Sequence, residues 1–323
     1  MTECYLYRLP NELLIHLLTL IITPELLPLA PLSHRIYTIV LRVLHNRLVI
    51  ASELESHSVL LECFHPSAKL TEPPYFCSSH GTDGLARYDE LPESEKHSPS
   101  RLGDMRKMYS RFRPHRRELE EGGRRVRRPG DIPGSRTHPG TTRDGYEGDT
   151  VKQILSLDGH ELFTQLVAQS HLVKIGPRHG LFTYPVEIEE GVIRVWREWL
   201  RGMAAKGQSV ETEEQKVEVV GTNKGKAPAT KVSQADRYEV VSDSRILWVS
   251  PKNNTGIRFN VKERKLRRDI PILIRADEDM PVSYEIEYDE LLIRTSHLVL
   301  MLENSLVLDD NTSGKAVVFG SFG

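Results

Sequence analysis

Cysteine and histidine lie close together at two places in the chain, Cys63 with His65 and Cys77 with His80. Two thiolates and two imidazoles would make a ligand set for tetrahedral zinc. The first pair has a single residue between its ligands, which is tighter than in common zinc knuckles, and Cys63 lies in an apolar run. We therefore expect free core thiols, surface histidines and no metal or other cofactor, and zinc binding is the alternative hypothesis.

Motifs for catalysis are absent from the sequence. The chain has no Gly-x-Ser-x-Gly elbow, no His-Glu-x-x-His pair, no phosphate-binding Gly-Lys-Ser/Thr loop and no dinucleotide fingerprint. Its 13 histidines are scattered, as is typical of surface and loop positions. We therefore expect a protein that is not an enzyme.

A basic segment spans residues 101–128, with eleven Arg or Lys residues against four Asp or Glu. Such a cluster would suit contacts to phosphates or a nuclear import signal. A solvated linker is the simplest interpretation. A helix that docks back on the fold is another, because Leu102, Met105, Tyr109 and Phe112 lie close to helical spacing. Few aromatic residues are interleaved with the basic ones and the net charge is −2, so we do not expect nucleic-acid binding.

Composition limits how much of the chain packs into a core and where the protein resides. Only 39% of the residues are apolar and the mean hydropathy is −0.38, which predicts sizeable unpacked segments. Three cysteines form no disulfide framework, which indicates a reducing compartment. The longest uncharged run, residues 17–24, is too short to span a bilayer, and polar residues interrupt any secretory signal. We expect a cytoplasmic or nuclear protein that makes no membrane contact.

Two polar stretches divide the chain. Residues 93–150 are basic and rich in Pro and Gly, and residues 203–236 are again polar, so both are predicted to be disordered. The remaining segments are an N-terminal unit and three parts of a β-rich domain. Their predicted bounds are 1–50 for the first unit and 51–92, 151–202 and 237–323 for the β-rich domain.

Several segments show strand patterns. Residues 257–262 and 282–289 alternate apolar and polar side chains, which is typical of half-buried strands. Residues 57–65 suit a buried strand, 297–303 a central strand and 315–322 a closing strand. The run 191–202 is predicted to be a strand that passes into a helical turn.

The N-terminal segment contains three helix signals. Pro10 suits a first helical position, and Thr23 and Ser33 suit the N-caps of two more helices. Leu13, Leu14, Leu17 and Leu18 form one apolar stripe of the first helix, and residues 36–44 carry an apolar face of the third. Three short helices cannot bury this much apolar surface by themselves, so we expect another protein to cover it.

The segments "LPNELL" and "PELLPLAPLSHRIY" resemble the F-box motif. The resemblance covers about 45 residues and implies docking to a Skp-family adaptor and, through it, to a cullin in a Skp–cullin–F-box (SCF) ubiquitin ligase complex. Pro28 and Pro31 depart from the pattern and predict a short or irregular second helix. The positions that match the family's adaptor contacts are Leu9, Pro10, Leu13, Leu14, Leu17, Leu26, Leu27, Leu29, Leu32, Ser33, Ile36 and Tyr37.

The order of an F-box and a β-rich region is similar to that of fungal-type F-box proteins and of F-box proteins with β-sandwich domains. The fold class expected is α+β: a three-helix F-box followed by a sandwich-like β-rich domain with two long disordered inserts. By this resemblance the chain is a substrate adaptor for protein ubiquitination that recruits an unknown protein. Two alternatives stay open: a lectin-like or nucleic-acid-binding module whose helices belong to its own core, and an F-box protein that works without a cullin.

Overall fold

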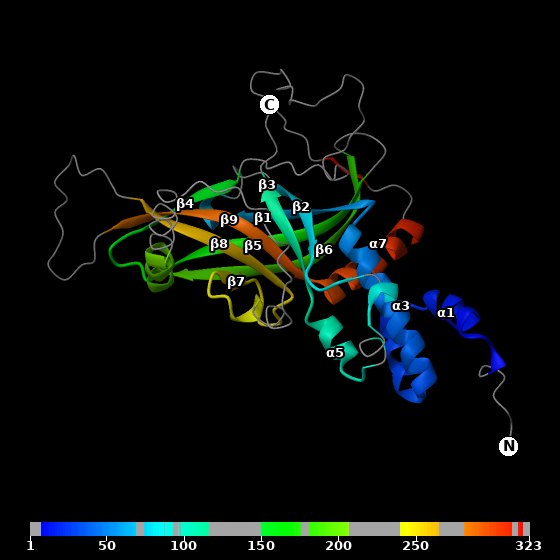
Figure 1. Ribbon diagram of the computed structural model, residues 1–323. Helices are drawn as coiled ribbons and strands as arrows, with labels where there is room; N and C mark the ends of the chain where they lie inside the picture. The colour runs from blue at the N-terminus through cyan, green and yellow to red at the C-terminus, as the bar shows by residue number, and fades with distance from the viewer. Residues whose placement is uncertain are drawn as a thin grey trace, which may run out of the picture.

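The structure is a computed structural model of the chain (Figure 1). It describes residues 8–68, 74–86, 88–92, 96, 98–115, 150–175, 181–206, 240–264, 281–311 and 316–318. Most of both predicted inserts, residues 116–149 and 207–239, lies outside the described residues, and the prediction of disorder there is not tested. No helix among the described segments is both long enough and apolar enough to cross a bilayer.

Helices come first in the chain, as the sequence predicts. They are α1 (Asn11–Thr19), α2 (Thr23–Leu26), the 3-10 helix η2 (Leu27–Leu32) and the long helix α3 (His34–Glu53). Because α3 runs to Glu53, the expected boundary at residue 50 falls inside a helix.

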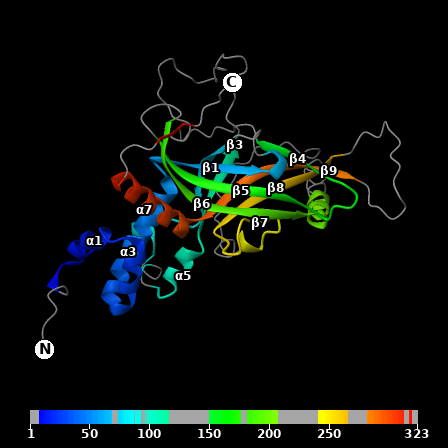
Figure 2. The same cartoon turned by 180° about the vertical axis from the view of Figure 1, so that it is seen from behind.

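The strands form one continuous antiparallel sheet in the order β10-β6-β5-β1-β2-β3-β9-β8-β7, with β4 paired to β9. The sheet curls into a nearly closed, barrel-like shape (Figures 1 and 2). The strands are β1 (His57–Phe64), β2 (Tyr75–Thr82), β3 (Tyr109–His115), β4 (Val151–Leu157), β5 (Phe163–Ile175), β6 (Leu181–Trp196), β7 (Ile246–Trp248), β8 (Thr255–Arg264), β9 (Val282–Arg294) and β10 (Ala316–Val318). The predicted α+β class is confirmed. The strands form one curled sheet, so the prediction of a sandwich-like domain is wrong.

The first long insert interrupts one edge of β9. Strand β3 pairs with the C-terminal part of β9, where Phe112 faces Leu291, and β4 pairs with the N-terminal part, where Val151 faces Tyr288. His115 and Thr150 bridge the two ends of the insert. Strands β3 and β4 therefore lie one after the other along the same edge of β9, on either side of the first predicted insert.

Helices cover the sheet at both ends. Helices α3, α5 (Arg101–Arg106) and α7 (Thr295–Asn311) gather with α1 at one end, and the helix over 197–206 lies at the other (Figure 1). Short 3-10 turns complete the fold: η3 (Pro66–Ala68), η4 (Tyr88–Glu90) and η7 (Val240–Ser242). One hydrophobic core, the main core, joins α3, the inner face of the sheet, the 197–206 helix and α7, so these helices and the barrel share their buried side chains.

Several strand predictions are confirmed. Residues 57–64 are buried as β1, and the alternating segments 257–262 and 282–289 lie in β8 and β9 with Phe259 and Tyr288 fully buried. The run 191–202 passes from β6 into the 197–206 helix, and part of the closing strand is present as β10.

Three predictions are wrong. Residues 297–303 belong to α7 and not to a central strand, because a short run that is apolar on both faces fits a buried helix as well. Residues 101–115 do not belong to a disordered linker, since α5 and β3 occupy them. Residues 203–206 do not belong to a disordered insert, because they continue the 197–206 helix and Met203 and Ala204 reach the core.

Candidate protein-binding face

Helix α1 has two apolar faces. Pro10 precedes the helix, and its carbonyl oxygen accepts a hydrogen bond from the Leu14 N–H (3.2 Å). Leu14 is 4% exposed, and Leu18 packs against the core from a half-buried position. Leu13 and Leu17 point the other way and are 50% and 46% exposed. What the sequence presents as one stripe is therefore divided between the protein's own core and its surface.

The second helical segment is short and irregular, as its prolines predict. Pro24 stands in the first turn of α2, and after four residues the chain continues as a 3-10 helix that contains Pro31. A proline has no N–H for the α-helical ladder, so the tighter 3-10 turn replaces it. This geometry buries Leu26 completely and leaves Leu27 and Leu32 exposed.

Helix α3 supports the other two. The Ser33 hydroxyl accepts a hydrogen bond from the Ile36 N–H (3.3 Å), which confirms the predicted N-cap. The apolar face of α3, from Ile36 to Leu44, is buried in the main core. Tyr37 is half-buried, and its hydroxyl donates to the carbonyl oxygen of Pro99 (3.0 Å).

A carboxylate from the far end of the chain caps α2. Thr23 is the first residue of that helix and not its N-cap, and its N–H donates to Glu303 Oε2 of α7 (3.0 Å). Arg47 of α3 donates to Glu303 Oε1 (2.9 Å) and to the Thr23 hydroxyl oxygen (2.7 Å). A negative charge at a helix N-terminus is favourable, and the cation that neutralises it comes from a third helix. The three groups hold α2, α3 and α7 together.

A second arginine fixes the start of the chain's helical part. Arg35 of α3 donates to Asn11 Oδ1 (2.8 Å) and to the Leu9 carbonyl oxygen. Leu9 is half-buried and Pro10 is exposed. The segment that opens the F-box-like motif is therefore held against α3.

The twelve residues predicted to contact an adaptor separate into three groups. Five are exposed, four are half-buried and three are buried inside the chain. The exposed residues are Pro10, Leu13, Leu17, Leu27 and Leu32, and the half-buried residues are Leu9, Leu29, Ser33 and Tyr37. The buried residues are Leu14, Leu26 and Ile36.

Two exposed apolar residues were not predicted to belong to the face. Leu20 is 77% exposed, and Ile22 is 43% exposed. Leu20 follows Leu13 and Leu17 at helical spacing, so the sequence contained the signal for it. Ile22 is the N-cap residue of α2, directly before Thr23, so no helical period relates it to Leu13 and Leu17. We call Leu13, Leu17, Leu20, Ile22, Leu27 and Leu32 the exposed leucine face.

The two candidate zinc pairs do not converge on a metal site. Cys63 and Cys77 are buried in the main core, where burial raises the pKa of the Cys63 thiol to about 12 and that of Cys77 still further. His65 is half-buried and bonds Ser67 through Nδ1, while His80 is exposed. Within the part of the chain that the structure describes, no group of three or more His, Cys, Asp or Glu side chains could hold a metal ion. Cys63 is a core thiol, as predicted.

Comparisons with known proteins found no matching family model, no matching curated protein and no matching solved structure.

Proposed function

We propose that the chain is a non-catalytic substrate adaptor of a Skp–cullin–F-box ubiquitin ligase complex. The exposed leucine face docks to a Skp-family adaptor, which connects the chain to a cullin, and the barrel-like domain recruits a protein for ubiquitination. One observation carries the proposal. In the segment from α1 to η2, some apolar side chains are buried in the protein's own core, whereas six others are exposed at its surface.

Exposed apolar side chains on such a short segment favour burial by a partner. Complete removal of a leucine side chain from water is worth about 1.5–3 kcal/mol, so a few of these residues can supply most of the affinity of an interface. Because Leu14, Leu26 and Ile36 are buried within the chain, the helices are already held in place, and little ordering entropy would be lost on docking.

The proposed mechanism is proximity. A ligase subunit that holds a substrate near a loaded ubiquitin-conjugating enzyme raises the effective concentration of the acceptor lysine at the thioester, and no side chain of this chain needs to take part in the chemistry. The contact of Arg47 and Thr23 with Glu303 favours this role because it links the docking helices to the helix that follows β9. The proposal places the protein in the cytoplasm or nucleus.

A second candidate is a binding module whose N-terminal helices serve its own fold alone. It is favoured by the shared core, in which Leu26 and Val40 belong to the same cluster as Val59 of β1. This candidate leaves the exposed leucine face without a role, and for that reason we rank it second.

Aspartate substitutions on the exposed leucine face test the proposal. Leu13→Asp and Leu17→Asp should reduce co-purification with a recombinant Skp-family adaptor by at least about tenfold, because a carboxylate would be buried without a partner. Leu162→Asp is the matched control, since Leu162 is 67% exposed but lies next to β5 in the barrel.

Circular dichroism and thermal unfolding should be the same for all three variants and the parent. Adaptor capture that survives both α1 substitutions would refute the docking model. If the adaptor is captured but its cullin is absent from the same purified complex, the chain works outside a ligase.

A further inference from the structure

The barrel closes at a seam where two strand edges meet without pairing. Strand β6 pairs with β5 on one side, and on the other side β10 reaches only Leu181 to Thr183. At the opposite end of the strand order, β7 pairs only with β8. In the described residues, the outer edge of β6 from Val186 to Trp196 and the outer edge of β7 therefore have no strand partner. Unpaired edges of this kind can accept an added strand.

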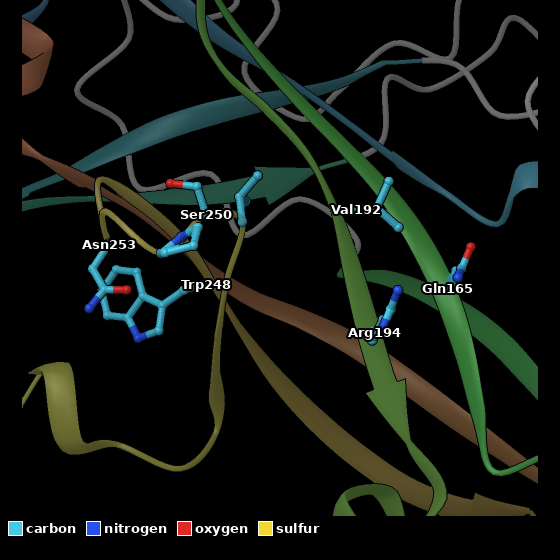
Figure 3. A pocket seen from close by; sticks show the side chains of 8 residues that line it. Gln165, Val192, Arg194, Trp248, Ser250 and Asn253 are labelled. Atoms are coloured by element: carbon cyan, nitrogen blue, oxygen red, sulfur yellow. The ribbon is translucent and has the colours of Figure 1, made fainter.

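One loop brings the two edges together. The loop after β7 passes so close to Gly191 of β6 that a Cβ atom there would lie 2.5 Å from the Val249 carbonyl oxygen. From this contact toward the C-terminal end of β6, the seam opens into a hollow of about 660 Å³ (Figure 3). It is lined by Gln165 of β5, Val192 and Arg194 of β6, Trp248 of β7, and Val249, Ser250, Pro251 and Asn253 of the loop after β7.

The loop wall of the hollow is held in place by the fold. The Ser250 hydroxyl donates to Glu189 of β6, and the Asn253 carbonyl oxygen accepts from the Tyr109 hydroxyl (2.8 Å) and from Arg294 (3.1 Å). The Trp248 ring packs against the Tyr109 ring with centroids 5.4 Å apart. The hollow therefore exists before any ligand arrives, which lowers the entropic cost of binding.

The chemistry of the lining selects a class of ligand. Val192 and Arg194 are exposed on the same face of β6, two residues apart, and Gln165 faces Arg194 across the β5–β6 ladder. Among the lining residues that the structure describes, Arg194 is the one with a charged side chain, and its guanidinium lies over the Phe163 ring at 5.6 Å. A ligand strand at this edge would place an apolar side chain beside Val192 and Trp248 and a carboxylate beside Arg194.

We propose that this seam binds an extended peptide segment with an apolar residue and an acidic residue two positions apart. The segment adds as a strand to the free edge of β6. In the ligase proposed above, the seam is the substrate-recruiting surface. That role rests on the proposed function, whereas peptide binding itself does not.

The test uses the full-length chain and a displayed library of random ten-residue peptides. Selected peptides should share the apolar-x-acidic spacing and should bind in fluorescence anisotropy. Arg194→Glu should weaken the best peptide by at least about tenfold and should shift a repeated selection toward Lys or Arg at the acidic position. Arg106→Glu, at an exposed arginine of α5, is the matched control and should change neither result.

Hydrogen exchange locates the bound peptide. Strand addition should slow amide exchange in residues 192–196 and 246–248. Failure to select any peptide, equal binding by Arg194→Glu, or protection elsewhere on the molecule would each overturn the proposal. Leu13→Asp should leave peptide affinity unchanged, so loss of adaptor binding and loss of peptide binding are separately measurable.

Discussion

The exposed leucine face and the barrel seam are both open surfaces of one molecule, but they differ in what they offer a partner. The leucine face presents side chains of α1 and η2 whose neighbours in sequence are buried, so its binding energy would come from apolar area. The seam presents the unpaired edges of β6 and β7 around a single arginine, so its selectivity would come from backbone pairing and charge. The two proposed partners would contact different elements, α1 to η2 for the first and β5, β6 and β7 with its following loop for the second.

The division of the N-terminal helices into an inner and an outer face can be tested most strongly at Leu26. Leu26→Ala should lower the free energy of unfolding by about 2–5 kcal/mol, because Leu26 is fully buried and a cavity would remain. Leu13→Ala is the comparison and should lower the free energy of unfolding by less than about 0.5 kcal/mol, since the Leu13 side chain is half exposed. Urea titration of both variants measures the difference. Similar losses at both positions would mean that the two faces are not distinct.

Glu303 links the N-terminal helices α2 and α3 to the C-terminal helix α7. Glu303→Ala should lower the free energy of unfolding by about 1–3 kcal/mol, because the Thr23 N–H and Arg47 lose their shared acceptor. Amide exchange should accelerate in residues 11–26. Glu198→Ala, at an exposed glutamate of the 197–206 helix, should leave exchange in residues 11–26 unchanged. Unaltered protection of α1 and α2 in Glu303→Ala would show that packing alone holds these helices.

Closure of the seam depends on the absence of a side chain at Gly191. Gly191→Ala should destabilise the protein by about 1–3 kcal/mol and displace the loop after β7, because its Cβ would meet the Val249 carbonyl oxygen and Cγ1 atom. Gly103→Ala in α5 has open space around its Cβ and should stabilise the helix by up to about 1 kcal/mol. Thermal unfolding of both variants measures the contrast. A neutral Gly191→Ala would mean that the seam is looser than the structure shows.

A smaller effect is expected from the buried His45 beneath η4. Burial lowers the pKa of His45 below its usual 6.5, Arg101 adds to the decrease, and the Ala86 carbonyl opposes it. The unfolded chain therefore binds a proton at His45 more readily than the folded chain does. The contribution of neutral His45 to the free energy of unfolding is fully present above about pH 6.5 and is lost as the pH falls below that value, by at most about 1.4 kcal/mol per pH unit.

Urea unfolding between pH 8 and pH 5 measures this dependence. His45→Asn should flatten the profile, and His80→Gln, at an exposed histidine, should not. An equally steep profile in His45→Asn would assign the pH dependence to other groups.

Local patterns predicted the elements with a regular period or a strong cap. Ser33, the alternation in β8 and β9 and the prolines of η2 were interpreted correctly, because each depends on residues within one turn or one strand. The run 297–303 was misassigned because an apolar segment of that length satisfies both a strand and a helix, and only its packing against α3 and β6 decides between them.

The sequence by itself determined that the N-terminal helices carry more apolar side chains than they can bury, and that β-strands follow them. Only the tertiary structure decided which leucines face inward, because that choice depends on α3 and on Glu303, 280 residues away from Thr23. It also decided that the strands form one curled sheet with an open seam. Strand patterns specify which face of a strand is buried, whereas the closure of a sheet depends on its twist and on contacts such as that of Val249 with Gly191.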